Sequence, residues 1–197
     1  MASSLVGTLG ASSPWQQRQA IDDGVAGIIV DNVTGDFEDL LAANARYAET
    51  FELAGFDGVA HAGVGVVTCM DSRIDPLRML GLQPGDAKML RNPGGRVTPQ
   101  ALAALVLGVN LLGVERVLVV PHTQCAMATA SEDELRRQVS DASGRDASWE
   151  TFGAVADQMT ALHEDVARVR AHPLIPARIA VGGFLYDVDT GRLTQLC

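Results

Sequence analysis

The sequence has little positive charge, and what it has is not clustered. It contains one lysine, Lys88, and its 15 lysines and arginines stand against 24 aspartates and glutamates, so the formal net charge is -9 at pH 7. The electrostatic field of such a chain repels polyanions. This balance excludes nucleic acids and anionic membrane surfaces as partners and favours a small neutral or freely diffusing substrate.

Cysteine is also scarce. The three cysteines, Cys69, Cys125 and Cys197, are too widely spaced to indicate a disulfide framework. In a reducing compartment, thiols with this distribution are more often metal ligands or nucleophiles than disulfide partners. We expect Cys197, the last residue, to be unengaged, and the first two to carry chemistry.

Long apolar runs are missing as well. The longest begins at Ala101, is interrupted by Asn110, and falls short of the ~20 residues that a membrane-spanning helix needs. The N-terminal segment has no basic residue before Arg18 and no sustained apolar stretch, so it does not have the pattern of a secretory signal. We therefore expect a cytoplasmic protein without a membrane partner.

The length and composition indicate one core. A chain of 197 residues that is 47% hydrophobic can bury one core but not two of full size. We expect residues 1–36 to be a loosely ordered extension and residues 37–197 to be a single α/β domain. An amphipathic helix is expected from Phe37 to near Gly55, with its apolar face packed either on its own core or on a partner subunit.

The remainder of the chain alternates between short apolar strands and helices. Strands are expected at residues 64–70, 87–92, 115–122 and from 178 to a turn at 189–191, and helices at 75–81, 98–113, from 131, and 154–171. Strands separated by helices indicate a mainly parallel central β-sheet flanked by helices. The fold class predicted here is therefore α/β.

Reactive side chains follow two of the apolar strands where each strand ends. Cys69, Asp71 and Arg73 occupy alternate positions, so an extended backbone would point all three to one side. His122 and Cys125 follow another strand, and their spacing brings them onto one face if the chain turns helically there. Open parallel sheets bind ligands beyond the carboxyl ends of their strands, so these side chains are expected to share one crevice.

Two thiols and one imidazole form a donor set suited to zinc, and three protein ligands leave a fourth position open, as in catalytic zinc sites. Asp71 can either complete the site or accept a hydrogen bond from a water on the metal, and Arg73 can hold the carboxylate off the metal as a bidentate partner. Taken singly, each feature has a simpler interpretation: an ordinary ion pair, a small buried thiol, a satisfied histidine. The metal site is favoured because all five residues lie at equivalent strand ends.

The segment CMDSR, with HTQC farther along the chain, resembles the C-x-D-x-R and H-x-x-C motifs of the β-carbonic anhydrases, and LRNPGG between them resembles that family's Arg-Asn-Ala-Gly loop. The resemblance runs from about residue 37 to the C-terminus and is to the short bacterial members of the family. It implies one zinc ion per subunit and the following roles: Cys69, His122 and Cys125 as ligands, Asp71 and Arg73 as the catalytic dyad, and Asp71 as a fourth ligand in a closed, inactive form.

The same resemblance implies reversible hydration of CO2 to bicarbonate and a proton. It also implies a homodimer or a dimer of dimers, in which the N-terminal helix embraces a neighbour near the active site. Backbone N–H groups of Gly94 and Gly95 are expected to donate to a substrate oxygen, although a plain turn also explains this glycine pair.

The chain departs from the family pattern next to its expected ligands. Similar members read His-Thr-Asp-Cys-Gly, whereas here Gln124 replaces the acid and Ala126 the glycine, and Pro121 precedes the histidine. A methyl group at Ala126 is costly if that position needs a positive φ. Two alternatives therefore stay open: hydrolysis of COS or CS2 at the same zinc site, and a catalytically weak zinc protein with a binding or regulatory role.

Overall fold

The structure, a computed structural model, describes residues 37–197, and the expectation for residues 1–36 lies outside the described residues. The chain divides after Phe51 into two units, which are described separately below. The second unit, Glu52–Cys197, carries every residue predicted to belong to the site.

The first unit contains the helix α1 (Glu38–Ala48). Acidic residues in its first turn and Arg46 in its last complement the helix dipole. The helix ends at Ala48, before the expected end near Gly55, because the next backbone amides bond three residues back and tighten the turn. The rings of Tyr47 and Phe51 then meet edge to face with centroids 5.7 Å apart.

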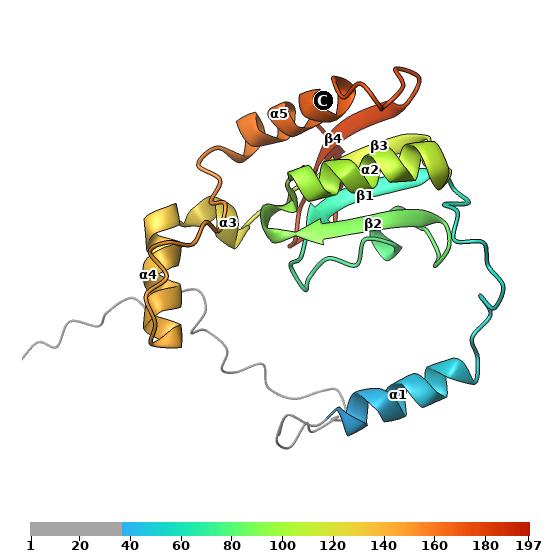
Figure 1. The fold of residues 1–197 in the computed structure, drawn as a ribbon, viewed down its shortest axis with the longest axis horizontal. Coiled ribbons are helices and arrows are strands. Elements are labelled where there is room, and N and C mark those ends of the chain that lie inside the picture. The colour runs from blue at the N-terminus through green and yellow to red at the C-terminus, as the bar shows by residue number, and fades with distance from the viewer. Residues whose placement is uncertain (1–36) are drawn as a thin grey trace, which may run out of the picture. The chain divides into compact units, whose positions relative to one another are not determined.

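A five-stranded sheet with strand order β2-β1-β3-β4-β5 forms the centre of the second unit (Figure 1). Its members are β1 (Val64–Cys69), β2 (Ala87–Asn92), β3 (Arg116–Val120), β4 (Ala180–Tyr186) and β5 (Leu193–Gln195). The first four are parallel, and only β5 runs antiparallel, against β4. The prediction of a mainly parallel α/β sheet is confirmed.

Helices and short turns connect these strands. They are η1 (Arg78–Leu80), η2 (Pro93–Gly95), α2 (Pro99–Leu111), α3 (Ala126–Thr129), α4 (Glu132–Ser143) and α5 (Gln158–Arg170). The predicted caps form, since Thr98 accepts from the Ala101 amide and Ser131 from the Glu134 amide. Among residues 37–197, no helix is long and apolar enough to cross a membrane.

The helix α5 begins later than the expected residue 154. The backbone amide of Val155 donates to the Met127 carbonyl at 2.7 Å, which commits this segment to a contact with α3. The Asp157 side chain then accepts from the amides of Met159 and Thr160 and starts the helix. A tertiary contact thus overrides the helix propensity of the preceding alanines.

The core lies between the sheet and two helices. α2 packs against β1 and β2, and α5 against β3 and β4. Buried side chains from both helices join Val67, Val119 and Val181 of the sheet in one cluster. Because β1, β2 and β3 are parallel and in register, the segments that follow them emerge at the same edge of the sheet.

Candidate metal centre

The strand β1 delivers the first expected ligand. All six of its residues are buried between β2 and β3, and Cys69 is the last of them. The Thr68 hydroxyl, also fully buried, donates to the Val120 carbonyl at 2.8 Å and ties the ends of β1 and β3 together. The Cys69 sulfur is therefore fixed at the carboxyl edge of the sheet.

Beyond Cys69 the expected extended backbone is wrong, because the chain turns instead. The Ile74 amide donates to the Asp71 carbonyl at 3.1 Å, and the Arg73 amide donates to Asp71 Oδ1 at 2.9 Å. This turn brings the side chains of Asp71 and Arg73 together, although the backbone is not the extended strand from which the contact was predicted.

Arg91 stabilises this turn, and the sequence analysis did not assign it a role. Its Nε donates to the Cys69 carbonyl at 3.0 Å and its Nη2 to the Asp71 carbonyl at 2.7 Å. The signal was present in the LRNPGG segment, since β2 is the neighbour of β1 and its register pairs Cys69 with Asn92.

His122 and Cys125 follow β3, but the helical turn expected between them does not form. The segment turns at Gln124, which has a φ of 56°, and Cys125 is the N-cap of α3. The His122 Nδ1 lies 2.8 Å from the Thr123 carbonyl, so this nitrogen carries the proton. Nε2 is then unprotonated and has a free lone pair. This nitrogen is buried and has no hydrogen-bond partner.

Three side chains converge at this edge. The ligand atoms of Cys69, His122 and Cys125 all lie within 4.8 Å of one another, and all three residues are buried. The two sulfur atoms are 4.0 Å apart. Two thiols and a free imidazole nitrogen form a set of soft and borderline donors that suits zinc, and a buried nitrogen without a partner is otherwise costly.

The two thiols perturb each other. The hydrogen bond from Cys125, which outweighs burial, lowers the pKa of Cys69, and the same contact together with burial raises the pKa of Cys125. Burial disfavours the charged form of His122, yet the nearby Cys69 sulfur leaves its pKa above the usual value. Without a cation, one thiol of the pair therefore keeps its proton. A metal ion that binds both sulfur atoms as thiolates would release that proton.

Asp71 and Arg73 lie beside this cluster. Arg73 Nε donates to Asp71 Oδ1 at 3.0 Å and Nη2 to Oδ2 at 2.8 Å, a bidentate pair. The side-chain hydrogen bond from Arg73 lowers the pKa of Asp71 to about 2, against the smaller effect of burial. The carboxylate oxygen Oδ2 lies 3.8 Å from His122 Nε2, so an ionised acid borders the cluster.

The glycine pair of η2 packs against the end of β1. Gly94 and Gly95 are buried and have φ values of 77° and 65°. A Cβ on Gly95 would lie 2.9 Å from the Cys69 backbone nitrogen, so no side chain fits there. The Gly94 amide donates a hydrogen bond that helps to lower the pKa of Cys69. A contact of either amide with substrate stays a prediction.

The structure also locates the departures from the family pattern. Gln124, and not Ala126, has the positive φ, and among residues 37–197 it is the one non-glycine residue that does. Ala126 is the first residue of α3 and has no positive φ, so its methyl group causes no backbone strain.

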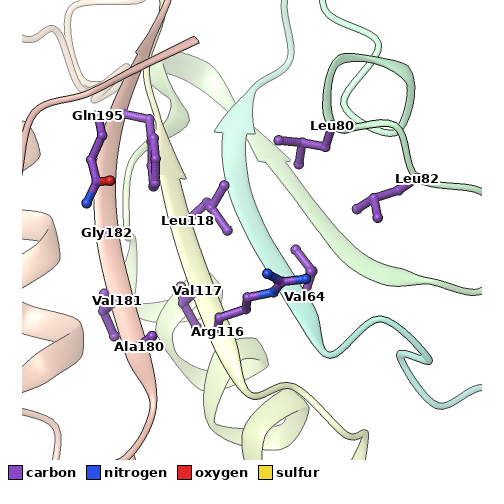
Figure 2. A pocket seen from close by; sticks show the side chains of 11 residues that line it. Val64, Leu80, Leu82, Arg116, Val117, Leu118, Ala180, Val181, Gly182 and Gln195 are labelled. Atoms are coloured by element: carbon purple, nitrogen blue, oxygen red, sulfur yellow. The ribbon is translucent and has the colours of Figure 1, made fainter.

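A cavity of about 340 Å³ lies away from this centre (Figure 2). Its lining is mostly apolar, and none of the predicted site residues belongs to it: it includes Val64, Leu80, Leu82, Arg116, Leu118 and Phe184. Val64, Leu118 and Phe184 belong to β1, β3 and β4, so the cavity lies along the sheet.

Fold and site together define an α/β protein with a Cys-His-Cys cluster that could hold a metal ion at the carboxyl edge of a parallel sheet. A sequence profile described as carbonic anhydrase matches residues 64–193. Over 163 residues the chain is 31% identical to beta-carbonic anhydrase 1 of Mycobacterium tuberculosis, covering 81% of this chain and 96% of that protein. The chain therefore belongs to the β-carbonic anhydrase family, as its motifs indicated.

Two further relatives bear on fold and substrate. The crystal structure of a carbonic anhydrase from Streptococcus mutans aligns with a TM-score of 0.74 and 36% identity, covering 82% of this chain and 97% of that one. A carbon disulfide hydrolase of an Acidianus species is 30% identical over 154 residues, covering 66% of this chain and 75% of that protein. Carbon disulfide hydrolases are thus among the proteins to which this sequence is similar, which keeps the CS2 alternative open.

Proposed function

We propose that this chain catalyses the reversible hydration of CO2, with one zinc ion per subunit held by Cys69, His122 and Cys125. The observation that carries the proposal is the convergence of three buried ligand atoms within 4.8 Å, one of them an unpartnered imidazole nitrogen. When bound, zinc acts as a Lewis acid that lowers the pKa of water toward about 7 and so makes a nucleophile available at neutral pH.

Asp71 supplies orientation in this reaction. Its pKa of about 2 keeps the carboxylate ionised, so it can only accept hydrogen bonds. An acceptor at this position takes a hydrogen bond from the attacking water and aims the water's lone pair at the carbon of CO2. Addition to that carbon gives bicarbonate, and the proton leaves to solvent.

Arg73 keeps Asp71 available for that role. The bidentate pair occupies both carboxylate oxygens, which opposes a swing of the acid onto the metal. Loss of the pair frees Asp71 to become a fourth ligand, which is the closed form. Of the two amides expected to contact substrate, we favour Gly95, because that of Gly94 is engaged with the Cys69 sulfur.

Stopped-flow CO2 hydration by zinc-quantified protein tests the proposal, with zinc-free protein as the blank and COS and CS2 as competing substrates. We expect zinc-dependent turnover of CO2 and a larger kcat/KM for CO2 than for either sulfur analogue. A larger kcat/KM for CS2 or COS would assign the chain to the hydrolase alternative. Zinc-replete protein that turns over none of the three substrates would support a binding or regulatory role.

We further propose a cytoplasmic homodimer or dimer of dimers. Two apolar surfaces support an assembly: the cavity of Figure 2 and the exposed apolar side chains of α1, including Leu40 and Leu41. Parallel sheets are normally covered on both faces, so a second copy is the simplest cover for the cavity. Sedimentation of the native protein should show a dimer or tetramer, and Leu82→Glu should shift it toward the monomer; a monomeric native protein would refute the assembly.

Thiolate ligands and the lack of a membrane-crossing helix among residues 37–197 support the cytoplasmic location. We also propose that residues 37–197 suffice as the catalytic domain, because the family match lies wholly within them. Cell fractionation tests the location. A chain beginning at residue 37 should retain zinc and turnover if the domain boundary is right.

A further inference from the structure

Gln124 contacts the outer side of the dyad. Arg73 Nη1 donates to Gln124 Oε1 at 3.3 Å, and Arg73 Nη2 lies 3.4 Å from the Gln124 backbone carbonyl. Gln124 Nε2 in turn donates to Asp189 Oδ2 at 2.6 Å. The amide has one working orientation, since reversing it would set its NH2 against the guanidinium and its oxygen against the carboxylate.

The backbone of Gln124 is committed to this arrangement as well. A φ of 56° is the left-handed region, which is unfavourable for a residue with a side chain and is kept only where the surroundings enforce it. Here that backbone directs the carbonyl as well as the side chain of Gln124 toward Arg73.

Asp189 lies on a turn that is itself fixed. The Asp189 amide donates to Asp187 Oδ1 at 2.9 Å, which closes the turn after β4. The Val188 amide donates to the Thr123 hydroxyl at 3.1 Å, which ties this turn to the segment that carries His122 and Cys125. These two hydrogen bonds fix the loop that places Asp189 beside Gln124.

We propose that Gln124 and Asp189 are positioning residues for the catalytic dyad, because Gln124 accepts from the Arg73 guanidinium and Asp189 fixes the Gln124 amide. The Arg73 side chain is 43% exposed, whereas that of Asp71 is 20% exposed, so the arginine needs outside contacts to stay in one rotamer. Asp71 engages Nε and Nη2, and Gln124 engages Nη1, so every guanidinium nitrogen has a partner. This inference rests on the proposed function, since it concerns the efficiency of the dyad.

Shortening residue 124 tests the contact without straining the backbone. Asparagine tolerates the left-handed region but cannot span from Arg73 to Asp189. We expect Gln124→Asn to lower kcat for CO2 about 3- to 10-fold, with KM and zinc content unchanged. Gln124→Gly, which relaxes the backbone fully, should show the same loss. Gln100→Asn, the same change at an exposed position of α2, is the matched control.

A charge exchange provides the rescue. Gln124→Glu alone places a carboxylate against Asp189 and should lower kcat by repulsion. Adding Asp189→Asn supplies an amide donor to that carboxylate, so the hydrogen bond between residues 124 and 189 forms again in the reverse direction while Arg73 still donates to residue 124. We expect the double variant to be faster than Gln124→Glu alone. A double variant no faster than the single one overturns the proposal.

A measurement independent of turnover separates this inference from the proposed function. In the zinc-loaded protein, ¹⁵N relaxation of the Arg73 Nε–H, assigned by its loss in Arg73→Lys, should report an order parameter near ~0.8 that falls below ~0.6 in Gln124→Asn. An unchanged order parameter overturns the proposal whatever kcat does. A native protein without CO2 turnover would refute the proposed function, and the Arg73 order parameter would still decide the positioning role.

Discussion

Arg73 holds Asp71 through three of its nitrogen atoms. The backbone amide and Nε donate to Oδ1 at 2.9 and 3.0 Å, and Nη2 donates to Oδ2 at 2.8 Å. Donors on both oxygens stabilise the charged carboxylate, which is why the pKa of Asp71 falls to about 2. An acid that stays ionised across the neutral range cannot deliver a proton, which fits the proposed role of Asp71 in orienting the nucleophile.

Removing the arginine should therefore cost activity rather than metal. We expect Arg73→Ala to keep its zinc and to lose at least about 10-fold in kcat/KM for CO2, because the carboxylate loses its orientation and is free to reach the metal. Arg73→Lys should not restore the rate, since an ammonium group cannot pair bidentately. Stopped-flow assays with zinc quantified by mass spectrometry decide this, and unchanged turnover would remove Arg73 from the mechanism.

At the scale of elements, the site depends on how η2 packs against β1. Buried Asp165 of α5 accepts from Arg96 Nε at 2.6 Å and from the Val97 amide at 3.0 Å, which fixes the segment that follows η2. The same segment brings Gly95 against the backbone of Thr68 and Cys69. A shift here moves the first ligand directly.

The two glycines of η2 offer a matched pair of substitutions. In Gly95→Ala the new Cβ would meet backbone atoms at 2.9 and 3.0 Å, whereas in Gly94→Ala the nearest atoms are side-chain carbons at 3.5 Å. We expect Gly95→Ala to lower the free energy of unfolding by about 2–4 kcal/mol and to weaken zinc binding. Gly94→Ala should cost only its backbone strain, about 1–2 kcal/mol. Denaturant unfolding measures both, and equal losses would contradict the steric argument.

The first turn of α4 anchors the loop before α5 through one carboxylate. Glu132 accepts from the backbone amides of Phe152 at 2.5 Å, Gly153 at 3.0 Å and Ala154 at 2.8 Å. These amides, that of Ala154 foremost, lower the pKa of Glu132 below its ordinary value of 4.5. Because the folded protein prefers the charged form, this stabilisation is complete above pH 4.5 and is lost as the pH falls through the lowered pKa.

Glu132→Gln should accordingly destabilise the protein most at neutral pH. We expect the difference in the free energy of unfolding between native protein and variant to be constant from pH 7 down to about pH 5 and to shrink below pH 4.5. Urea unfolding of both proteins at matched pH values measures it, and zinc release in acid affects both alike. A difference that grows in acid would contradict the assigned pKa direction.

The elements that the sequence predicted correctly are those fixed by local rules. β1 and β3 read as continuous apolar runs because both are buried, and Thr98 and Ser131 mark their helices by capping. The start of α5 was predicted too early, because the Val155 amide is committed to the distant Met127 carbonyl. The convergence of Cys69, His122 and Cys125 could be predicted from their places after strand ends, whereas the hydrogen bond from Gln124 to Asp189 joins two loops and no local pattern encodes it.

At the scale of the whole molecule, the metal centre joins parts of the chain that are distant in sequence. Cys69 ends β1, whereas His122 and Cys125 follow β3, and the backbone of His122 accepts from the Gln158 side chain of α5 at 3.0 Å. A metal ion held by Cys69, His122 and Cys125 would link the segments that follow β1 and β3. In the unfolded chain Cys69 is far from His122 and Cys125, so zinc bound as proposed would favour the native state.

Stability should consequently follow the free zinc concentration. If one ion binds the native subunit and none the unfolded chain, the free energy of unfolding rises by about 1.4 kcal/mol for each tenfold increase in free zinc above the dissociation constant. Urea unfolding in zinc buffers spanning several decades measures this slope, and zinc retained by unfolded thiols would make it shallower.

Cys125→Ser should abolish the slope because it removes a ligand. Cys197→Ser, the same change at a residue outside the Cys69, His122 and Cys125 cluster, should preserve it. A slope that survives Cys125→Ser would show that zinc stabilises the fold from elsewhere, and the ligand assignment would then be wrong.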